Sequence, residues 1–191
     1  MKRYALSLSL LVLAVSAVSA QTASYVPDKA HSTVDYTVGH LTVSSEKGHF
    51  SNVAGAIQIN DADISKSTVN VTIDTTTIDS GSSAENAVLK EPAFFNIAQF
   101  PSAAFKSTAV TRTATGLSIS GDLTLRGVTK PVVLDVTGAG GQPIAASQKL
   151  PTAFTATTTV KRSAFGIGNG YPNSVIGDDV KLTINIALVK Q

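Results

Sequence analysis

The stretch from residue 116 to residue 136, GLSISGDLTLRGVTKPVVLDV, decides the fold. In its first half an apolar residue or glycine stands at every second position from Leu117 to Leu125, and polar residues stand between them. Residues 126–130 hold a glycine and few apolar side chains, and Pro131 opens a second alternating run that ends at Val136. A period of two is typical of a strand with one apolar face, and proline is tolerated at the first residue of a strand. The stretch therefore predicts a β-hairpin whose apolar side must be covered.

The same alternation recurs along the chain and predicts further strands. They lie in residues 32–38, 55–60, 69–80, 100–110, 154–160 and 180–188, while the polar residues 44–49 are not assigned to a strand. One short helix is expected, capped by Ser82 or Ser83, running through Lys90 and stopped by Pro92. About eight strands and one helix predict an all-β domain.

Two closed arrangements suit such a pattern, a sandwich of two sheets and an up-and-down barrel. Long strands with mostly short connections favour an antiparallel barrel, because a closed barrel leaves no strand edge exposed. A barrel of about eight strands is wide enough either to be filled by its own side chains or to hold one small ligand. The alternation by itself leaves both possibilities open.

The first residues have the pattern of a targeting segment. Lys2 and Arg3 precede an apolar run at residues 5–14, and residues 18–20, VSA, fit a cleavage site with small side chains. We predict a secretory signal peptide at residues 1–20, cleavage before Gln21, and a single domain at residues 21–191. The alternative, an uncleaved anchor, fits less well because the apolar run is too short for a stable membrane span.

The remaining composition excludes several classes of partner. Without Lys2 and Arg3 the chain has 13 basic and 13 acidic residues, so its charge gives no support for a nucleic-acid surface. It contains no cysteine, which excludes disulfides and a lipoprotein anchor. No second apolar segment is long enough for a stable membrane anchor. We expect a soluble exported protein.

Several motifs, in order along the chain, resemble one known family. They are GDLTLRGVTKPV at 121–132; Asp28 to Ser32 with Val34, Val38 and His40; Gly48-His49-Phe50 with Gly55; Leu89-Lys90, Phe94-Phe95, Phe100-Pro101 and Phe105; and Arg162, Phe165-Gly166-Ile167 and Gly177-Asp178-Asp179-Val180. Together they span most of the chain beyond the signal peptide. The chain resembles the YceI-like family of exported polyisoprenoid-binding proteins.

The resemblance implies a lipocalin-like, eight-stranded β-barrel in the periplasm that holds an isoprenoid or a similar long-chain amphiphilic lipid for transport, storage or sequestration. Each methylene buried in such an interior contributes about 0.8 kcal/mol, so tight binding needs no strong polar anchor. We predict that the ligand-binding residues are His31, Val34, Tyr36, Val38, Phe50, Val71, Ile73, Leu89, Phe94, Phe95, Phe105, Leu117, Ile119, Leu123, Phe154, Arg162 and Phe165.

The chain departs from the family pattern at one place. Members commonly carry Arg-Asp-x-His before the Leu-Lys of the short helix, whereas this chain has Glu85, Asn86, Ala87 and Val88. Both the cation and the histidine are missing. If relatives use this element to hold an anionic head group, a neutral head such as a quinone, an amide or an alcohol is expected here.

No residue pattern predicts a metal, a cofactor or a catalytic site. His31, His40 and His49 are nine residues apart, and no acidic residue accompanies them at ligand spacing. We expect structural hydrogen bonding for His31 and surface positions for the other two. No G-x-S-x-G motif marks a serine nucleophile, and FGIGNG at 165–170 predicts a loop at the barrel rim.

Two further side-chain roles have alternatives. Arg162 is expected to pair with Asp178 or Asp179, with direct ligand contact as the alternative. At most one of Phe94 and Phe95 lines a cavity if their backbone is extended, and otherwise both plug the end of the barrel.

The favoured function is therefore a lipid-binding protein that performs no covalent chemistry. One alternative is a lipid-modifying enzyme in which His31, His40 and His49 are acid–base groups. The other is a filled barrel that serves as an interaction module. A homodimer is left open.

Overall fold

The computed structural model describes residues 22–145 and 150–191. The predicted signal peptide and its cleavage site before Gln21 lie outside the described residues. Within the described ranges, no helix is both long enough and apolar enough to cross a membrane.

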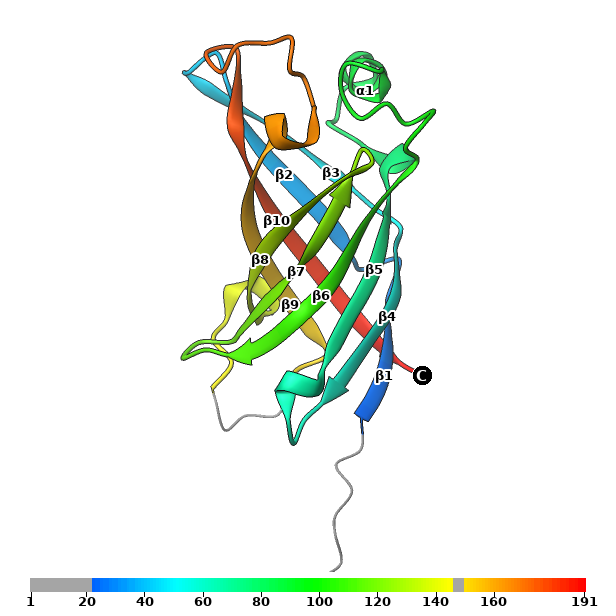
Figure 1. The fold of residues 1–191 in the computed structure, drawn as a ribbon, viewed down its shortest axis with the longest axis vertical. Coiled ribbons are helices and arrows are strands. Elements are labelled where there is room, and N and C mark those ends of the chain that lie inside the picture. The colour runs from blue at the N-terminus through cyan, green and yellow to red at the C-terminus, as the bar shows by residue number, and fades with distance from the viewer. Residues whose placement is uncertain (1–21, 146–149) are drawn as a thin grey trace, which may run out of the picture.

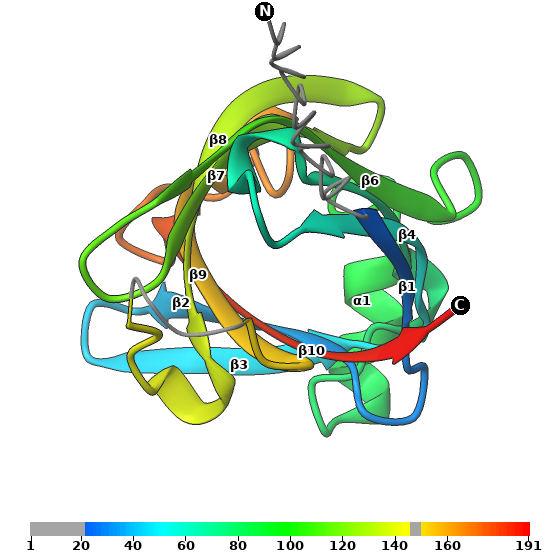
Figure 2. The ribbon, with the colours of Figure 1, turned by 90° about the horizontal axis from the view of Figure 1, so that it is seen from below.

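Antiparallel strands form one sheet that closes on itself (Figures 1 and 2). The sheet runs β1-β4-β5-β6-β7-β8-β9-β10-β2-β3, and an additional pairing between β1 and β10 closes the ring. The strands are β1 Thr22–Pro27, β2 Thr33–His40, β3 Ser44–Phe50, β4 Val53–Asn60, β5 Thr68–Asp74, β6 Ser102–Arg112, β7 Leu117–Leu125, β8 Val128–Gly138, β9 Ala153–Lys161 and β10 Ile176–Lys190.

These ten strands make an eight-stranded wall because two positions of the barrel are each built from two successive strands. β10 pairs with β1 at Leu188–Lys190 and with β2 along residues 176–185, so β1 and β2 share one side of it. β4 pairs with β1 and β3 pairs with β2, which makes β3 and β4 the next position. The predicted fold class, an all-β eight-stranded antiparallel barrel with one short helix, is confirmed.

Strand β3 was not predicted, and its composition explains why. Its sequence SSEKGHF has one apolar side chain, Phe50, at its end. Gly48 stands opposite Tyr36 of β2, and the phenol ring of Tyr36 occupies the space above it. A side chain of the neighbouring strand β2 thus covers β3, so the sequence of β3 does not itself alternate between apolar and polar residues. The predicted continuation of β5 through residue 80 was also wrong, because Thr75–Thr77 form a 3₁₀ turn capped by the Asp74 side chain.

The hairpin of β7 and β8 forms as predicted, with a tighter turn. Arg126 and Gly127 both have positive φ, 51° and 72°, as a two-residue type I′ turn requires. Pro131 is therefore inside β8 and not at its first residue. It is tolerated because β8 pairs with β9 only from Asp135 to Gly138, which leaves the edge of β8 beyond that region without a neighbouring strand.

Gly121 in this hairpin gives the first testable prediction. A Cβ at this position would lie 2.5 Å from Cζ of Phe105 and 2.6 Å from the carbonyl oxygen of Lys106. We expect Gly121→Ala to lower the free energy of unfolding by about 1–3 kcal/mol, because the added methyl overpacks the wall. Urea denaturation measures the change, with the adjacent Ser120→Ala as the control. An unchanged midpoint in Gly121→Ala would contradict the prediction.

The helix caps one end of the barrel. α1, Ser83–Lys90, begins after Ser82, whose hydroxyl accepts a hydrogen bond from the Glu85 N–H at 3.4 Å, as the capping pattern predicted. α1 and the segment between β9 and β10 lie together at this end, which we call the helix end (Figure 1). The start of β1 and the end of β10 lie at the opposite end, the terminus end.

Candidate functional site

Two apolar cavities occupy the inside of the barrel. The terminus-end cavity has a volume of about 150 Å³ and the helix-end cavity a volume of about 130 Å³. An apolar cavity of this size stays dry and can accept a small apolar molecule or a part of a larger one. Four side chains line both cavities and form what we call the waist: Val34, Ile73, Leu123 and Leu182.

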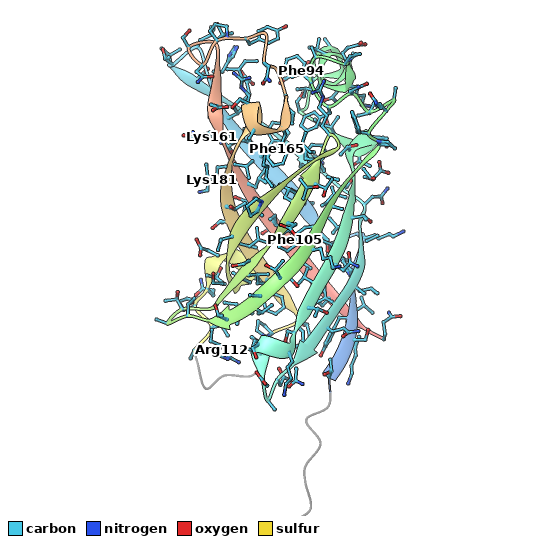
Figure 3. The ribbon with its side chains drawn as sticks, in the orientation of Figure 1. Phe94, Phe105, Arg112, Lys161, Phe165 and Lys181 are labelled. Carbon is cyan, nitrogen blue, oxygen red and sulfur yellow. The ribbon has the colours of Figure 1, made fainter. Side chains whose placement is uncertain are left out.

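The cavities are apolar because the period-two alternation of several strands points the same class of side chain inward. Val71 of β5 stands beside Phe105 of β6, and Phe105 stands beside Leu123 of β7, so three neighbouring strands present one row of apolar side chains. Phe105 lies at mid-height of the barrel, and Phe94 and Phe165 lie near the helix end (Figure 3). The wall is thus suited to hydrocarbon rather than to polar guests.

The structure brings every predicted ligand-binding residue except His31 to these cavities. The terminus-end cavity is lined by Val34, Val71, Ile73, Phe105, Leu117, Ile119, Leu123 and Phe154. The helix-end cavity is lined by Val34, Tyr36, Val38, Phe50, Ile73, Leu89, Phe94, Phe95, Leu123, Arg162 and Phe165. His31 instead lies in the loop between β1 and β2, where its exposed ring contacts Oδ2 of Asp28 at 2.8 Å through Nδ1.

Several lining residues were missed, although their signal was present in the sequence. The apolar residues missed on β4, β8, β9 and β10 are Val53, Ile57, Ile59, Val132, Leu134, Val136, Ala156, Val160, Ile176, Val180, Leu182, Ile184, Ile186 and Leu188. Most of these belong to alternating runs, and that of β10 is the most regular in the chain. Extending each run to all of its inward positions would have found them.

Aromatic side chains gather around the helix-end cavity. Phe50 contacts Phe95 edge to face with ring centroids 5.3 Å apart, and Tyr36 lies 6.0 Å from Phe50. Phe94 contacts Tyr171 with centroids 5.5 Å apart. Both Phe94 and Phe95 line the cavity, because the backbone after α1 turns and is not extended.

Arg162 is a structural residue at the rim of the helix-end cavity. Its side chain is 4% exposed. The guanidinium donates to the carbonyl oxygens of Gly177, Ile167, Gly168, Tyr171 and Ile176 at 2.7–3.1 Å and to Oδ1 of Asn173 at 3.2 Å. Since a guanidinium has five N–H donors, none is left over for a ligand.

The expected pairing of Arg162 with Asp178 or Asp179 was wrong. Lys161, the preceding residue, pairs with Asp179 at 2.8 Å and with Asp178 at 3.9 Å. Arg162 points the other way, into the loop between β9 and β10, where the carbonyls of that loop surround it. Its buried charge is stabilised by these dipoles.

Tyr36 also contributes to the wall of the helix-end cavity. The ring is 8% exposed, and its hydroxyl has no hydrogen-bond partner among the described residues. Burial, reinforced by the negative charges of Glu85, Glu46 and Asp79, raises the pKa of Tyr36 to about 12. The phenol is therefore neutral at any physiological pH.

The three histidines lie apart from the cavities and from any shared centre. Nδ1 of His40 contacts Glu46 at 3.2 Å, and the backbone of His49 bridges to Asp79. In the part of the chain that the structure describes, no group of three His, Cys, Asp or Glu residues is placed to hold a metal ion. Tyr36 and Arg162 are the only ionisable side chains in the described walls of the two cavities.

Comparison with known proteins agrees with this architecture. The model of the YceI-like domain matches residues 25–188. A UPF0312 protein of Vibrio parahaemolyticus is 33% identical over 172 residues, which cover 87% of this chain and 89% of the relative. A UPF0312 protein of Yersinia pestis is 38% identical over 142 residues, 72% of this chain and 74% of the relative.

Solved structures share the fold. BcnA of Burkholderia cenocepacia superposes with a TM-score of 0.72 at 22% identity, covering 85% of this chain and 99% of that one. A structure from Saccharophagus degradans, described as a polyisoprenoid binding domain, gives 0.62 at 14% identity over 90% of this chain and 100% of that one. The match of the family model across nearly all of the described residues, together with the curated relatives, places this chain in the YceI-like family.

Proposed function

We propose that this protein is exported to the periplasm and holds an isoprenoid or a similar long-chain lipid inside its barrel, for transport, storage or sequestration. The observation that carries the proposal is the pair of apolar cavities that lie on either side of the waist and share its four side chains. A long chain that crosses the waist buries its methylene groups in both cavities, and each buried group contributes about 0.8 kcal/mol. The description of the Saccharophagus degradans structure as a polyisoprenoid binding domain supports the same class of ligand.

The lipid in this proposal has a neutral head, such as a quinone, an amide or an alcohol. Arg162, the cation in the described walls, has every N–H engaged with protein oxygens. On α1, Asn86 donates to Oδ1 of Asp79 at 3.0 Å and accepts from the N–H of Ser80 at 2.8 Å, so this position serves to fix the helix. The cavity therefore offers no free cation to balance a pyrophosphate.

Binding without covalent chemistry is the function that the geometry favours. The histidines of the enzyme alternative lie in three separate places, and an acid–base pair would have to face the ligand. The cavities also favour a guest over the filled barrel of the interaction module.

Native mass spectrometry after mild purification tests the proposal. We expect a co-purifying lipid with a long hydrocarbon chain. The mass of this lipid should stay the same after prolonged incubation, both with the wild-type protein and with His31→Ala. Added geranylgeraniol should bind more tightly than geranylgeranyl pyrophosphate. A protein that carries no lipid and also rejects both prenyl compounds would contradict the proposal, and turnover of the lipid would support the enzyme. The same spectra report whether the protein is a monomer or a homodimer.

A further inference from the structure

Exposed hydrophobic side chains gather at the helix end of the barrel. Among the described residues six large hydrophobic side chains are exposed, and two of them, Val133 and Val189, stand on the strands β8 and β10. The other four, which we call the end residues, are Leu41 and Val43 in the turn between β2 and β3, Val88 on α1 and Tyr171 in the loop between β9 and β10. Exposed hydrophobic residues that are scattered singly need no explanation, but their concentration at one end of a molecule marks a contact surface.

The turn between β2 and β3 presents its hydrophobic residues to water at a conformational cost. Leu41 and Thr42 both have positive φ, 51° and 60°, which is uncommon for residues other than glycine and rare for a β-branched one. A tight turn with two positive φ values favours Asn-Gly. Val43, the next residue, is 86% exposed, more than any other large hydrophobic residue in the described chain. Neither the shape of the turn nor the packing of the barrel therefore accounts for Leu41 and Val43.

The elements that carry the end residues lie together at one extremity of the barrel (Figure 1). The N–H of Leu41 donates to the carbonyl oxygen of Val175 at 2.9 Å, which joins the turn to the loop between β9 and β10. In that loop the ring of Tyr171 contacts the ring of Phe94, which follows α1, with centroids 5.5 Å apart. Phe94 also lines the helix-end cavity. The end residues thus belong to one connected surface beside that cavity.

The charged side chains near the end residues do not form a cationic patch. Glu46 and Lys47 follow the turn on β3, and Glu85, Lys90 and Glu91 lie on α1 or directly after it. Acidic and basic residues are therefore mixed, and no cluster of lysines attracts an anionic surface. Attachment at this end has to come from the hydrophobic side chains.

A fluid bilayer suits the spacing of the end residues better than a protein partner does. They stand on three separate elements. A protein partner needs one continuous and complementary patch, whereas the interface of a bilayer accepts each apolar side chain separately, and tyrosine is favoured there. The proposed guest also has to come from a membrane, because water disfavours its long hydrocarbon chain.

We propose that the helix end docks on a neutral phospholipid bilayer and inserts its four end residues among the head groups. Docking brings the helix-end cavity against the membrane that supplies or receives the guest. This inference rests on the proposed function, lipid binding inside the barrel, and adds to it the surface from which the barrel takes its lipid.

A tryptophan in place of Val43 tests the docking directly, because the chain has no tryptophan of its own. Vesicles of phosphatidylcholine and phosphatidylethanolamine should shift the emission of Val43→Trp to shorter wavelength, and brominated phosphatidylcholine should quench it. Raising the salt concentration should not reverse the shift, since no charge cluster takes part. Val133→Trp puts the same reporter at an exposed position of β8 and should show neither the shift nor the quenching.

The double variant Leu41→Ser and Val43→Ser tests what the docking does. It removes hydrophobic groups from the turn, and neither residue lines a cavity. We expect uptake of geranylgeraniol from donor vesicles to slow about tenfold, because less of the protein is bound to the vesicles. The affinity for geranylgeraniol added from solution should stay the same. The matched control, Val133→Ser with Val189→Ser, replaces two other exposed residues and should keep both properties of the wild-type protein.

Two results would overturn the docking and leave lipid binding intact. One is an unshifted emission of Val43→Trp on vesicles while geranylgeraniol still binds from solution. The other is a shift that appears without vesicles and grows with protein concentration, because the turn would then contact a second copy of the chain. A wild-type protein that rejects geranylgeraniol from solution would instead overturn the proposed function, and the inference with it.

Discussion

Replacing Arg162 with alanine is expected to lower the free energy of unfolding by about 3 kcal/mol or more. The guanidinium is the common donor for five carbonyl oxygens that belong to the loop between β9 and β10 and to the start of β10. Alanine leaves these oxygens without a donor, and those of Ile167 and Gly168 lie in a buried environment where water cannot replace the guanidinium. Thermal and urea denaturation measure the effect.

Two companion variants separate this role from that of a surface charge. Lys161→Ala removes the neighbouring cation, whose ion pairs with Asp178 and Asp179 are on the outside, and should change the free energy of unfolding by less than about 1 kcal/mol. Arg162→Lys should restore only part of the loss, since an ammonium has three donors and lacks the planar fork. Equal stabilities of Arg162→Ala and Lys161→Ala would contradict the structural role.

Replacing Ala156 with phenylalanine is expected to abolish tight binding of long-chain lipids. Ala156 of β9 lines the terminus-end cavity and lies between Val136 of β8 and Ile184 of β10. The added ring occupies space that a chain would otherwise fill. If it excludes about four methylene groups, each worth about 0.8 kcal/mol, the affinity falls by more than about a hundredfold.

The length of the ligand makes this prediction specific. Geranylgeraniol, which has to cross the waist, should lose binding, whereas the shorter geraniol should keep its place in the helix-end cavity. Thr159→Phe puts the same ring on an exposed position of the same strand and should bind both alcohols as the wild-type protein does. Equal losses for the two alcohols in Ala156→Phe, with the barrel still folded by circular dichroism, would contradict a ligand that spans both cavities.

The sequence predicts the barrel where each strand carries its own apolar face. β7, β8 and β10 show the alternation directly. Ser82 and Pro92 stand close to the residues where α1 begins and ends. β3 could not be predicted in the same way, because the apolar group that covers Gly48 belongs to Tyr36 on another strand. Short-range patterns do not contain such cross-strand compensation.

The same distinction applies to the candidate site. Inward-facing residues such as Val71 and Ile119 follow from alternation once the barrel is assumed. The partners of Arg162 do not, because backbone carbonyls are present at every residue and carry no sequence signal. In the sequence, Asp178 and Asp179 were the obvious acidic partners for Arg162, but in the structure both form ion pairs with Lys161. The missing partner of the Tyr36 hydroxyl is likewise visible only in three dimensions.

The waist has a consequence for how long a guest remains inside. In the proposed binding mode, a chain that extends from the helix-end cavity into the terminus-end cavity slides lengthwise past Val34, Ile73, Leu123 and Leu182 when it is withdrawn through the helix end. Each carbon that is pulled through gives up its contacts before the next one moves, so the barrier to escape grows with every added unit of the chain. Among lipids with the same head, dwell time should therefore rise steeply with chain length, and the dissociation rate becomes a measure of how far the tail reaches.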